Sequence, residues 1–166
     1  MTTRLGPNHV GIISPLLPIT SSFVLPFTAY FALLSVRVIR RRLQDKVYLG
    51  DGPPPLENLA SPSVVDNALF VANRCHANFV EHFPMALLLA AAAELNDAGR
   101  RSLTAALDVL LAARVAHVDL GLRRPGAAGM GRAFGFYGTM GSMAFLSGYA
   151  GWLVKGYWGF RLRLCV

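Results

Sequence analysis

Four long apolar runs limit what this chain can fold into more than any other feature of its sequence. Their bounds are 11–36, 69–95, 102–122 and 133–154. Each is long enough for one helical membrane crossing, which takes about 20 residues. The first and last runs contain no charged residue. The second and third contain several, among them Asp108 and Asp119, so we expect both runs to be bundle helices and not lipid-exposed ones, because lipid cannot hydrate charges. For Asp108 two positions remain open, a polar contact within the bundle or a water-filled seam along the axis of an oligomer.

Composition agrees with a membrane protein. Of the 166 residues, 54% are hydrophobic and only 15% are charged, whereas about a quarter of a soluble domain is charged. We therefore predict one all-α domain over residues 1–166, an integral membrane four-helix bundle with helices at about 11–39, 69–95, 102–122 and 133–157. The first run is too long for a cleaved signal peptide, so we expect it to be retained.

Basic residues gather at the ends of these runs and account for the formal net charge of +7. The segments after the first and third runs hold Arg37, Arg40, Arg41, Arg42, Lys46, Arg123, Arg124 and Arg132. These segments hold more basic residues than the parts of the chain expected on the other side of the membrane. This difference favours a cytoplasmic position for both segments, in either the bacterial inner membrane or the endoplasmic reticulum. Arg40–Arg42 also suits contact with anionic lipid. Arginines at helix ends are not the solvated, aromatic-interleaved surface of a nucleic-acid binder, so we expect no nucleic-acid partner.

The head of the second run is unusually polar. At about 100° per residue, Arg74, Asn78 and Glu81 fall within roughly 60° of one another on a helix. His82 flanks this stripe, whereas His76 points to the opposite side. One helix face thus presents a cation, an amide and a carboxylate, which favours a ligand site. The alternative is a buried Arg74–Glu81 ion pair that only fixes helix packing.

Polar residues from the other runs converge on the same membrane level. Arg37 ends the first run, Arg114 and His117 lie near the end of the third, and Arg132 opens the fourth. Convergence of four helices supports a site at this end. Cys75, Cys165 and the histidines show no metal-ligand spacing, so we expect no metal.

The fourth run is rich in small residues at four-residue spacing, a pattern that permits close helix approach in membranes. The pairs are Gly131 with Gly135, Ala144 with Gly148, and Ser147 with Gly151.

The stretch Arg-x-His-x-Asn-Phe-x-Glu-x-x-Pro at 74–84 resembles the second-helix signature of the MAPEG superfamily, the membrane-associated proteins in eicosanoid and glutathione metabolism. Arg37, the Arg114-x-x-His117 pair and Gly131-Arg132-x-x-Gly135 extend the resemblance over most of the chain. His117 and Gly121 stand where the eicosanoid enzymes have tyrosines, and Val38 where they have a second arginine. The chain is therefore most similar to the short bacterial and fungal members.

The resemblance implies a homotrimer that binds glutathione as co-substrate between adjacent subunits, near the cytosolic membrane face. Arg74, Asn78, Glu81 and His82 match positions that hold glutathione, and Arg114 and His117 are assigned to the same site. Arg37 and His76 match positions that reach the ligand from a neighbouring subunit. Arg132 matches the arginine that activates the thiol, and is the expected catalytic residue.

Two functions remain open on these residues. The first is a glutathione transferase or peroxidase that acts on lipophilic electrophiles or lipid hydroperoxides from the bilayer. The second is a non-catalytic, lipid-binding member that resembles the lipoxygenase-activating protein, a branch that lacks the activating arginine. Arg132 favours the enzyme. An unrelated small transporter or scaffold would not need a polar set at one end of the bundle.

Overall fold

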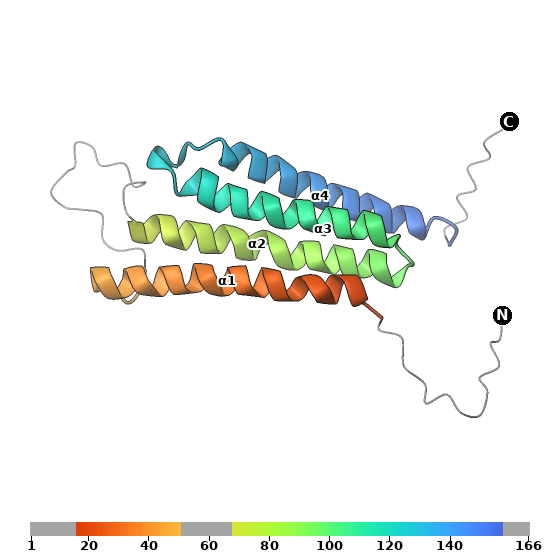
Figure 1. The fold of residues 1–166 in the computed structure, drawn as a ribbon, viewed down its shortest axis with the longest axis horizontal. Coiled ribbons are helices and arrows are strands. Elements are labelled where there is room, and N and C mark those ends of the chain that lie inside the picture. Colours follow the sequence, from red (N-terminus) through yellow and green to blue (C-terminus); the bar gives the residue numbers. More distant parts are fainter. Residues whose placement is uncertain (1–15, 51–67, 158–166) are drawn as a thin grey trace, which may run out of the picture.

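Four long helices lie side by side and alternate in direction in the computed structural model, which describes residues 16–50 and 68–157 (Figure 1). They are α1 (Pro18–Asp45), α2 (Ala68–Leu95), α3 (Arg100–Val115) and α4 (Gly131–Leu153). A π-helix, η2 (Ala116–Leu122), extends α3, and the 3-10 turn η3 (Pro125–Ala127) leads into α4. Regular structure in the described residues is helical throughout, which confirms the predicted all-α fold with four helices.

α1 is displaced along the sequence from its predicted bounds of 11–39. It begins at Pro18, because proline at the first helical position already has a helical φ and has no N–H to leave unsatisfied. Residues 11–15 lie outside the described part of the chain. The helix continues to Asp45 because arginine, leucine and glutamine favour helices even where they would leave lipid. It stops at Lys46, whose φ of 54° is left-handed.

The other bounds differ less. α2 begins one residue before the predicted start, and α4 runs from Gly131 to Leu153 where 133–157 was predicted. The predicted third helix, 102–122, divides at Ala116 into α3 and η2. A π-helix is rare and places successive side chains out of step with an α-helix. An apolar run marks where a helix is buried, but it does not show such a change of helix type.

An aromatic seam joins α1 to α2. Phe27 of α1 and Phe79 of α2 are fully buried, and their ring centroids lie 6.3 Å apart. Phe83, one turn further along α2, stacks on Phe79 at 4.7 Å and on Phe27 at 6.1 Å. Offset contacts of this kind add to the burial of large apolar surfaces. Across the core, α3 contributes fully buried Leu107 and α4 fully buried Leu146.

Asp108 is exposed in the single chain. The expected polar contact within the bundle of one chain is therefore wrong, whereas a seam along the trimer axis stays a prediction. Leu103, Leu107 and Leu110 set the buried face of α3. Position 108 follows Leu107 by about 100° and therefore turns off that face. Asp119, in contrast, is partly buried between η2 and α1.

The outside of the bundle is largely apolar. Large hydrophobic side chains are exposed on α1, α2 and α4, including Leu25, Leu88, Phe134, Tyr137 and Trp152. By length and composition, α1 is the one described helix that could cross a membrane. The prediction of four membrane spans stays a prediction. An apolar exterior of this extent is what lipid or a partner subunit covers.

Glu94, near the end of α2, caps the start of α1. Its Oε1 accepts a hydrogen bond from the Ile19 N–H at 2.6 Å, and its Oε2 accepts one from the Thr20 N–H at 2.8 Å. The residue before the helix, Leu17, supplies no side-chain cap. A carboxylate at a helix N-terminus satisfies orphan N–H groups and meets the positive end of the helix dipole. One side chain thus ties α1 to α2 at the end of the bundle opposite η2.

Glu94→Ala should therefore lower the free energy of unfolding by about 1–3 kcal/mol, because two partly buried N–H groups lose their acceptor. Glu94→Gln should lose less, since it keeps one acceptor. Reversible unfolding in mixed micelles would measure both effects, with Asp108→Asn as the control for removal of an exposed carboxylate. Equal stability of Glu94→Ala and the control would show that the cap contributes nothing.

Candidate functional site

A cavity of about 230 Å³ opens at the η2 end of the bundle. Its polar wall consists of Arg74, Asn78 and Arg132. Arg74 and Asn78 lie one turn apart on α2, so their side chains share a face. Arg132 comes from the first turn of α4. The structure thus brings together three residues predicted for the site, and two of them are cations.

Arg114 lies behind this wall and holds Asn78 in place. Its side chain is buried, with 2% of the residue exposed. Nη1 donates to Asn78 Oδ1 at 2.8 Å, and Nη2 donates to the Gly135 carbonyl oxygen at 3.0 Å. A guanidinium has only donors, so Asn78 must present its oxygen to Arg114. The Asn78 amide NH₂ is then left as a donor for other partners.

His117 supports Arg132 in the same way. Its Nδ1 lies 2.9 Å from the Arg132 carbonyl oxygen, and a carbonyl accepts, so Nδ1 carries the proton. The ring is buried. His117 and Arg114 were both predicted to bind the ligand, but the structure places them behind the cavity, where they fix the residues that line it.

Glycines let α4 approach η2 closely. A Cβ on Gly135 would collide with His117 and with the Ala113 carbonyl, and a Cβ on Gly121 would collide with the Arg132 backbone. The predicted close approach is therefore present at Gly131 and Gly135. It is not present at Gly148 and Gly151, where an added Cβ would meet nothing within 4 Å.

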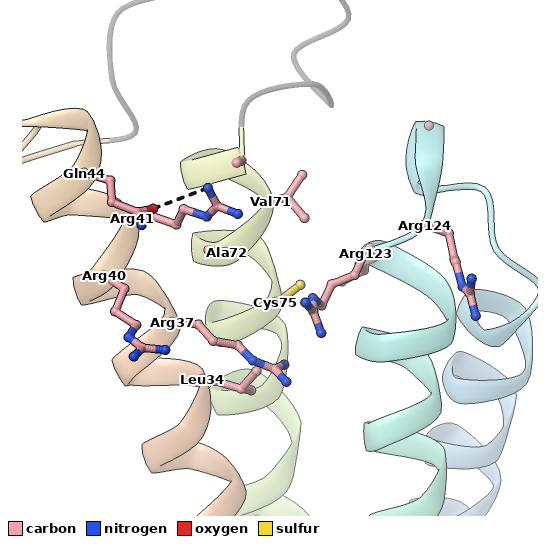
Figure 2. Close-up of a pocket in the computed structure, with 13 residues that line it drawn as sticks. Leu34, Arg37, Arg40, Arg41, Gln44, Val71, Ala72, Cys75, Arg123 and Arg124 are labelled. Carbon is pink, nitrogen blue, oxygen red and sulfur yellow. Dashed lines mark hydrogen bonds between the residues drawn. The ribbon is translucent and has the colours of Figure 1, made fainter.

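A second pocket, of about 540 Å³, lies beside the first at the same end of the bundle (Figure 2). The two share Val71 and Leu122 as a partition. Five arginines line the second pocket, three from the end of α1 and two from the end of η2. They are Arg37, Arg40, Arg41, Arg123 and Arg124.

Asp119 organises the inner side of this pocket. Its Oδ1 pairs with Arg37 Nη1 at 3.0 Å and with Arg123 Nη1 at 2.6 Å. The Tyr30 hydroxyl donates to Oδ2 at 2.9 Å. Asp119, Tyr30 and Arg123 were not predicted to belong to a site. Two features of the sequence could have indicated the Asp119–Arg123 pair, an acidic residue inside an apolar run and an arginine four residues after it.

The remaining predicted residues line neither cavity. His76 lies on the α1 side of α2, where its Nε2 is 3.1 Å from Ser35 Oγ. His82 Nδ1 lies 2.8 Å from the Asn78 carbonyl oxygen. Glu81 is exposed. Within the described residues, ion pairs involve Asp119 only, so the alternative of a buried Arg74–Glu81 pair is wrong.

The described part of the chain contains no group of three or more histidine, cysteine, aspartate or glutamate residues that could hold a metal ion. The polar groups that line the smaller cavity are two arginines and an amide, groups suited to an anionic organic ligand.

Most of the chain matches one known protein family. The model of the MAPEG family matches residues 22–152, which runs from the first turns of α1 to the last turn of α4. The chain belongs to the MAPEG family. The resemblance predicted from the stretch 74–84 is thus confirmed. No curated protein and no solved structure matches the chain.

MAPEG proteins are membrane-associated, which agrees with the apolar exterior and with α1 as a candidate span. In this MAPEG protein the π-helix, the two glycine contacts and the His117 hydrogen bond all act on one point, the first turn of α4. Their common consequence is the position of Arg132.

Gly135→Ala should test this packing. The added methyl group overlaps His117, so α4 must move outward, at a cost of about 1–3 kcal/mol typical of overpacking. Gly141→Ala, in the same helix, adds its methyl group to open space and should be neutral or stabilising. Unfolding of both variants in micelles would measure the difference. Equal stabilities would mean that α4 does not depend on contact with η2 at this point.

Proposed function

We propose that this MAPEG protein is a membrane-bound enzyme that binds glutathione in the cavity of Arg74, Asn78 and Arg132 and activates its thiol against lipophilic electrophiles. The observation that supports it most is the pair of cations around one cavity with no carboxylate among the described lining residues. Glutathione brings two carboxylates and a thiol, all of which such a site favours as anions.

Arg132 is proposed to stabilise the thiolate. A free thiol titrates near ~8.5, so most of it is protonated at neutral pH. A decrease of about two units in the thiol pKa needs roughly 2.7 kcal/mol. One unpaired guanidinium about 4 Å away provides roughly that much at an intermediate dielectric. Arg132 makes no ion pair with any described residue, so its charge is available.

Arg74 and Asn78 are proposed to bind the peptide part of the ligand. Arg74 is exposed at the mouth of the cavity, where it can form a bidentate pair with a carboxylate. The Asn78 amide NH₂, left as a donor by Arg114, can bind a peptide carbonyl. Glu81, exposed one turn further along α2, offers an acceptor for the ligand's ammonium group.

The chemistry that follows is nucleophilic attack. The thiol proton leaves to water, and the sulfur electron pair forms a bond to an electrophilic carbon of a lipophilic substrate. The bond that breaks is either that to a leaving group, which departs with its electron pair, or a conjugated double bond, whose displaced electrons take up a proton from water. The same thiolate would attack the O–O bond of a lipid hydroperoxide, which releases an alcohol and leads, with a second glutathione, to the disulfide. Transferase and peroxidase activities therefore depend on one residue, Arg132.

A homotrimer is proposed to complete the site. The cavity volume of about 230 Å³ is below the roughly 300–1,000 Å³ of ordinary ligand sites. A wall from a second copy would enlarge it. His76 lies away from Arg74 in its own chain, which suits a residue that serves a neighbouring site. Arg37 bonds Asp119 through Nη1, and its other N–H groups have no acceptor within residues 16–50 and 68–157, which leaves donors for the same role.

The alternative of a lipid-binding, non-catalytic member has support of its own. Large apolar side chains, among them Phe134, Tyr137 and Phe145, are exposed along α4. They could bind a lipid tail without any thiol chemistry. The role of Arg132 decides between the two functions.

Arg132→Ala should lower kcat/KM for conjugation roughly ten- to a hundredfold at neutral pH, because the thiol pKa returns toward ~8.5. The loss should shrink as the pH approaches that value, since the free thiol then ionises unaided. The thiolate absorbance of bound glutathione should disappear at neutral pH, while calorimetry still detects binding.

The matched control is Arg101→Ala, which removes the same charge in the first turn of α3, at the end of the bundle away from Arg132. This variant should keep both the activity and the thiolate absorbance. A wild-type protein that binds no glutathione would favour the lipid-binding alternative. Full activity of Arg132→Ala would remove its catalytic role.

Light scattering in mild detergent should give the mass of three chains of 17.9 kDa each. Co-expression of His76→Ala with Arg132→Ala should restore part of the activity that each variant lacks alone, because some sites of a mixed trimer receive both native residues. A monomeric mass, or no restoration, would contradict a site shared between subunits.

A further inference from the structure

The pocket beside the glutathione cavity concentrates positive charge from distant parts of the chain. Arg40 and Arg41 belong to the end of α1, whereas Arg123 and Arg124 follow some 80 residues later at the end of η2. Figure 2 shows Arg37 and Arg123 pointing toward each other across Cys75. The fold, not a run of neighbours in sequence, therefore assembles this charge.

Compensation within the pocket is incomplete. None of its described lining residues is acidic. Asp119, behind the lining, pairs with Arg37 and Arg123 through one oxygen atom. Among the described residues, the hydrogen-bond partner of Arg41 is Gln44, at a long 3.4 Å. Clustered guanidinium groups repel one another unless an anion lies between them, so the pocket has the charge of a site for a multivalent anion.

The inner walls of the pocket are apolar. Leu34 of α1, Val71 of α2 and Leu122 of η2 form them. The volume of about 540 Å³ is within the range of sites that take molecules larger than a free ion. A cationic rim above an apolar wall fits an amphiphile, with its anionic group among the arginines and its first carbons against the leucines.

We propose that this pocket binds a phosphate-bearing amphiphile, the headgroup of an anionic phospholipid. Arginine pairs with phosphate through two parallel hydrogen bonds, and basic pockets between helices at the membrane surface recognise such headgroups. The location at the ends of α1 and η2, next to an apolar exterior, gives a lipid lateral access. The proposal rests on the membrane insertion assumed for the proposed function, but not on glutathione chemistry.

The experiment uses the full chain purified in mild detergent and titrated with phosphatidylglycerol, with native mass spectrometry to count bound lipids. We expect saturable binding of one phosphatidylglycerol per chain and much weaker binding of phosphatidylcholine. The double variant Arg41→Gln, Arg124→Gln should lower the affinity for phosphatidylglycerol about thirtyfold, because each arginine contributes roughly a five- to sixfold gain. Arg100→Gln with Arg101→Gln makes the same change in charge at the other end of the bundle and should leave the affinity unchanged.

Equal affinity of the two double variants would overturn the proposal, because binding would then follow net charge and not this pocket. Inorganic phosphate is a separate arm of the titration. If inorganic phosphate displaces the lipid at micromolar concentration, the pocket binds a free phosphate compound, and the proposal of a phospholipid ligand is wrong. If glutathione displaces the lipid, the pocket is part of the glutathione site and the proposal fails.

Arg132→Ala separates this inference from the proposed function. It should bind phosphatidylglycerol as the wild type does, even though its conjugating activity is lost. If the protein stays in solution without detergent, it is not inserted in a membrane and the lipid proposal fails. The titration with inorganic phosphate would then show whether the arginines bind an anion.

Discussion

The buried guanidinium of Arg114 is the interaction on which the rest of the structure depends. It starts from α3 and donates to Asn78 of α2 and to the Gly135 carbonyl of α4, so it joins three helices at one point. A charge this deeply buried is costly unless its donors find acceptors. Its Nε has no acceptor among the described residues, which makes the bonds that its two Nη atoms form to Asn78 and Gly135 the more necessary. Both acceptors, an amide oxygen and a carbonyl, must therefore keep their positions.

The position of α4 follows from that requirement. For its carbonyl to reach Arg114, Gly135 must lie against α3 and η2, and only a residue without a Cβ can do so. The same approach allows His117 to bond the Arg132 carbonyl. His117 faces α4 while Asp119, two residues on, faces α1, because residues two apart on a helix lie on nearly opposite sides. One short helical segment thus supplies a support for each of the two pockets.

The sequence predicts those features that depend on one helix at a time. The apolar runs predict four helices, and the periodicity of α2 places Arg74 and Asn78 together, as the structure confirms. Glu81 belongs to the same stripe by angle, yet it lies outside the cavity. Glu81 lies about one turn, or roughly 5 Å, beyond Asn78, which is the last residue of α2 that lines the cavity. Angular position on a helix does not show where along its axis a cavity ends.

Features that depend on contact between distant segments could not be read in this way. Asp119 meets Arg37 across 82 residues, and nothing in either local pattern specifies the other. The π-helix has no clear signal in hydropathy, because the residues of η2 are as apolar as those of a helix of ordinary pitch. Arg114 and His117 were predicted to bind the ligand because polar residues in apolar runs suggest sites. The structure shows a second reason for such residues, which is to hold the site in place.

The two pockets differ in how their charge is balanced, and this difference bears on what each can do. Asp119 neutralises part of the charge on Arg37 and Arg123, so the inner side of the larger pocket attracts an anion less strongly than its rim. Arg74 and Arg132 have no carboxylate partner among the described residues. A ligand sulfur in the smaller cavity would therefore lie beside the charge of Arg132 with no carboxylate of the described lining to offset it. Val71 and Leu122 separate the two environments with apolar side chains. An anion in the larger pocket and the proposed thiolate in the smaller one would therefore occupy separate sites with separate arginine partners.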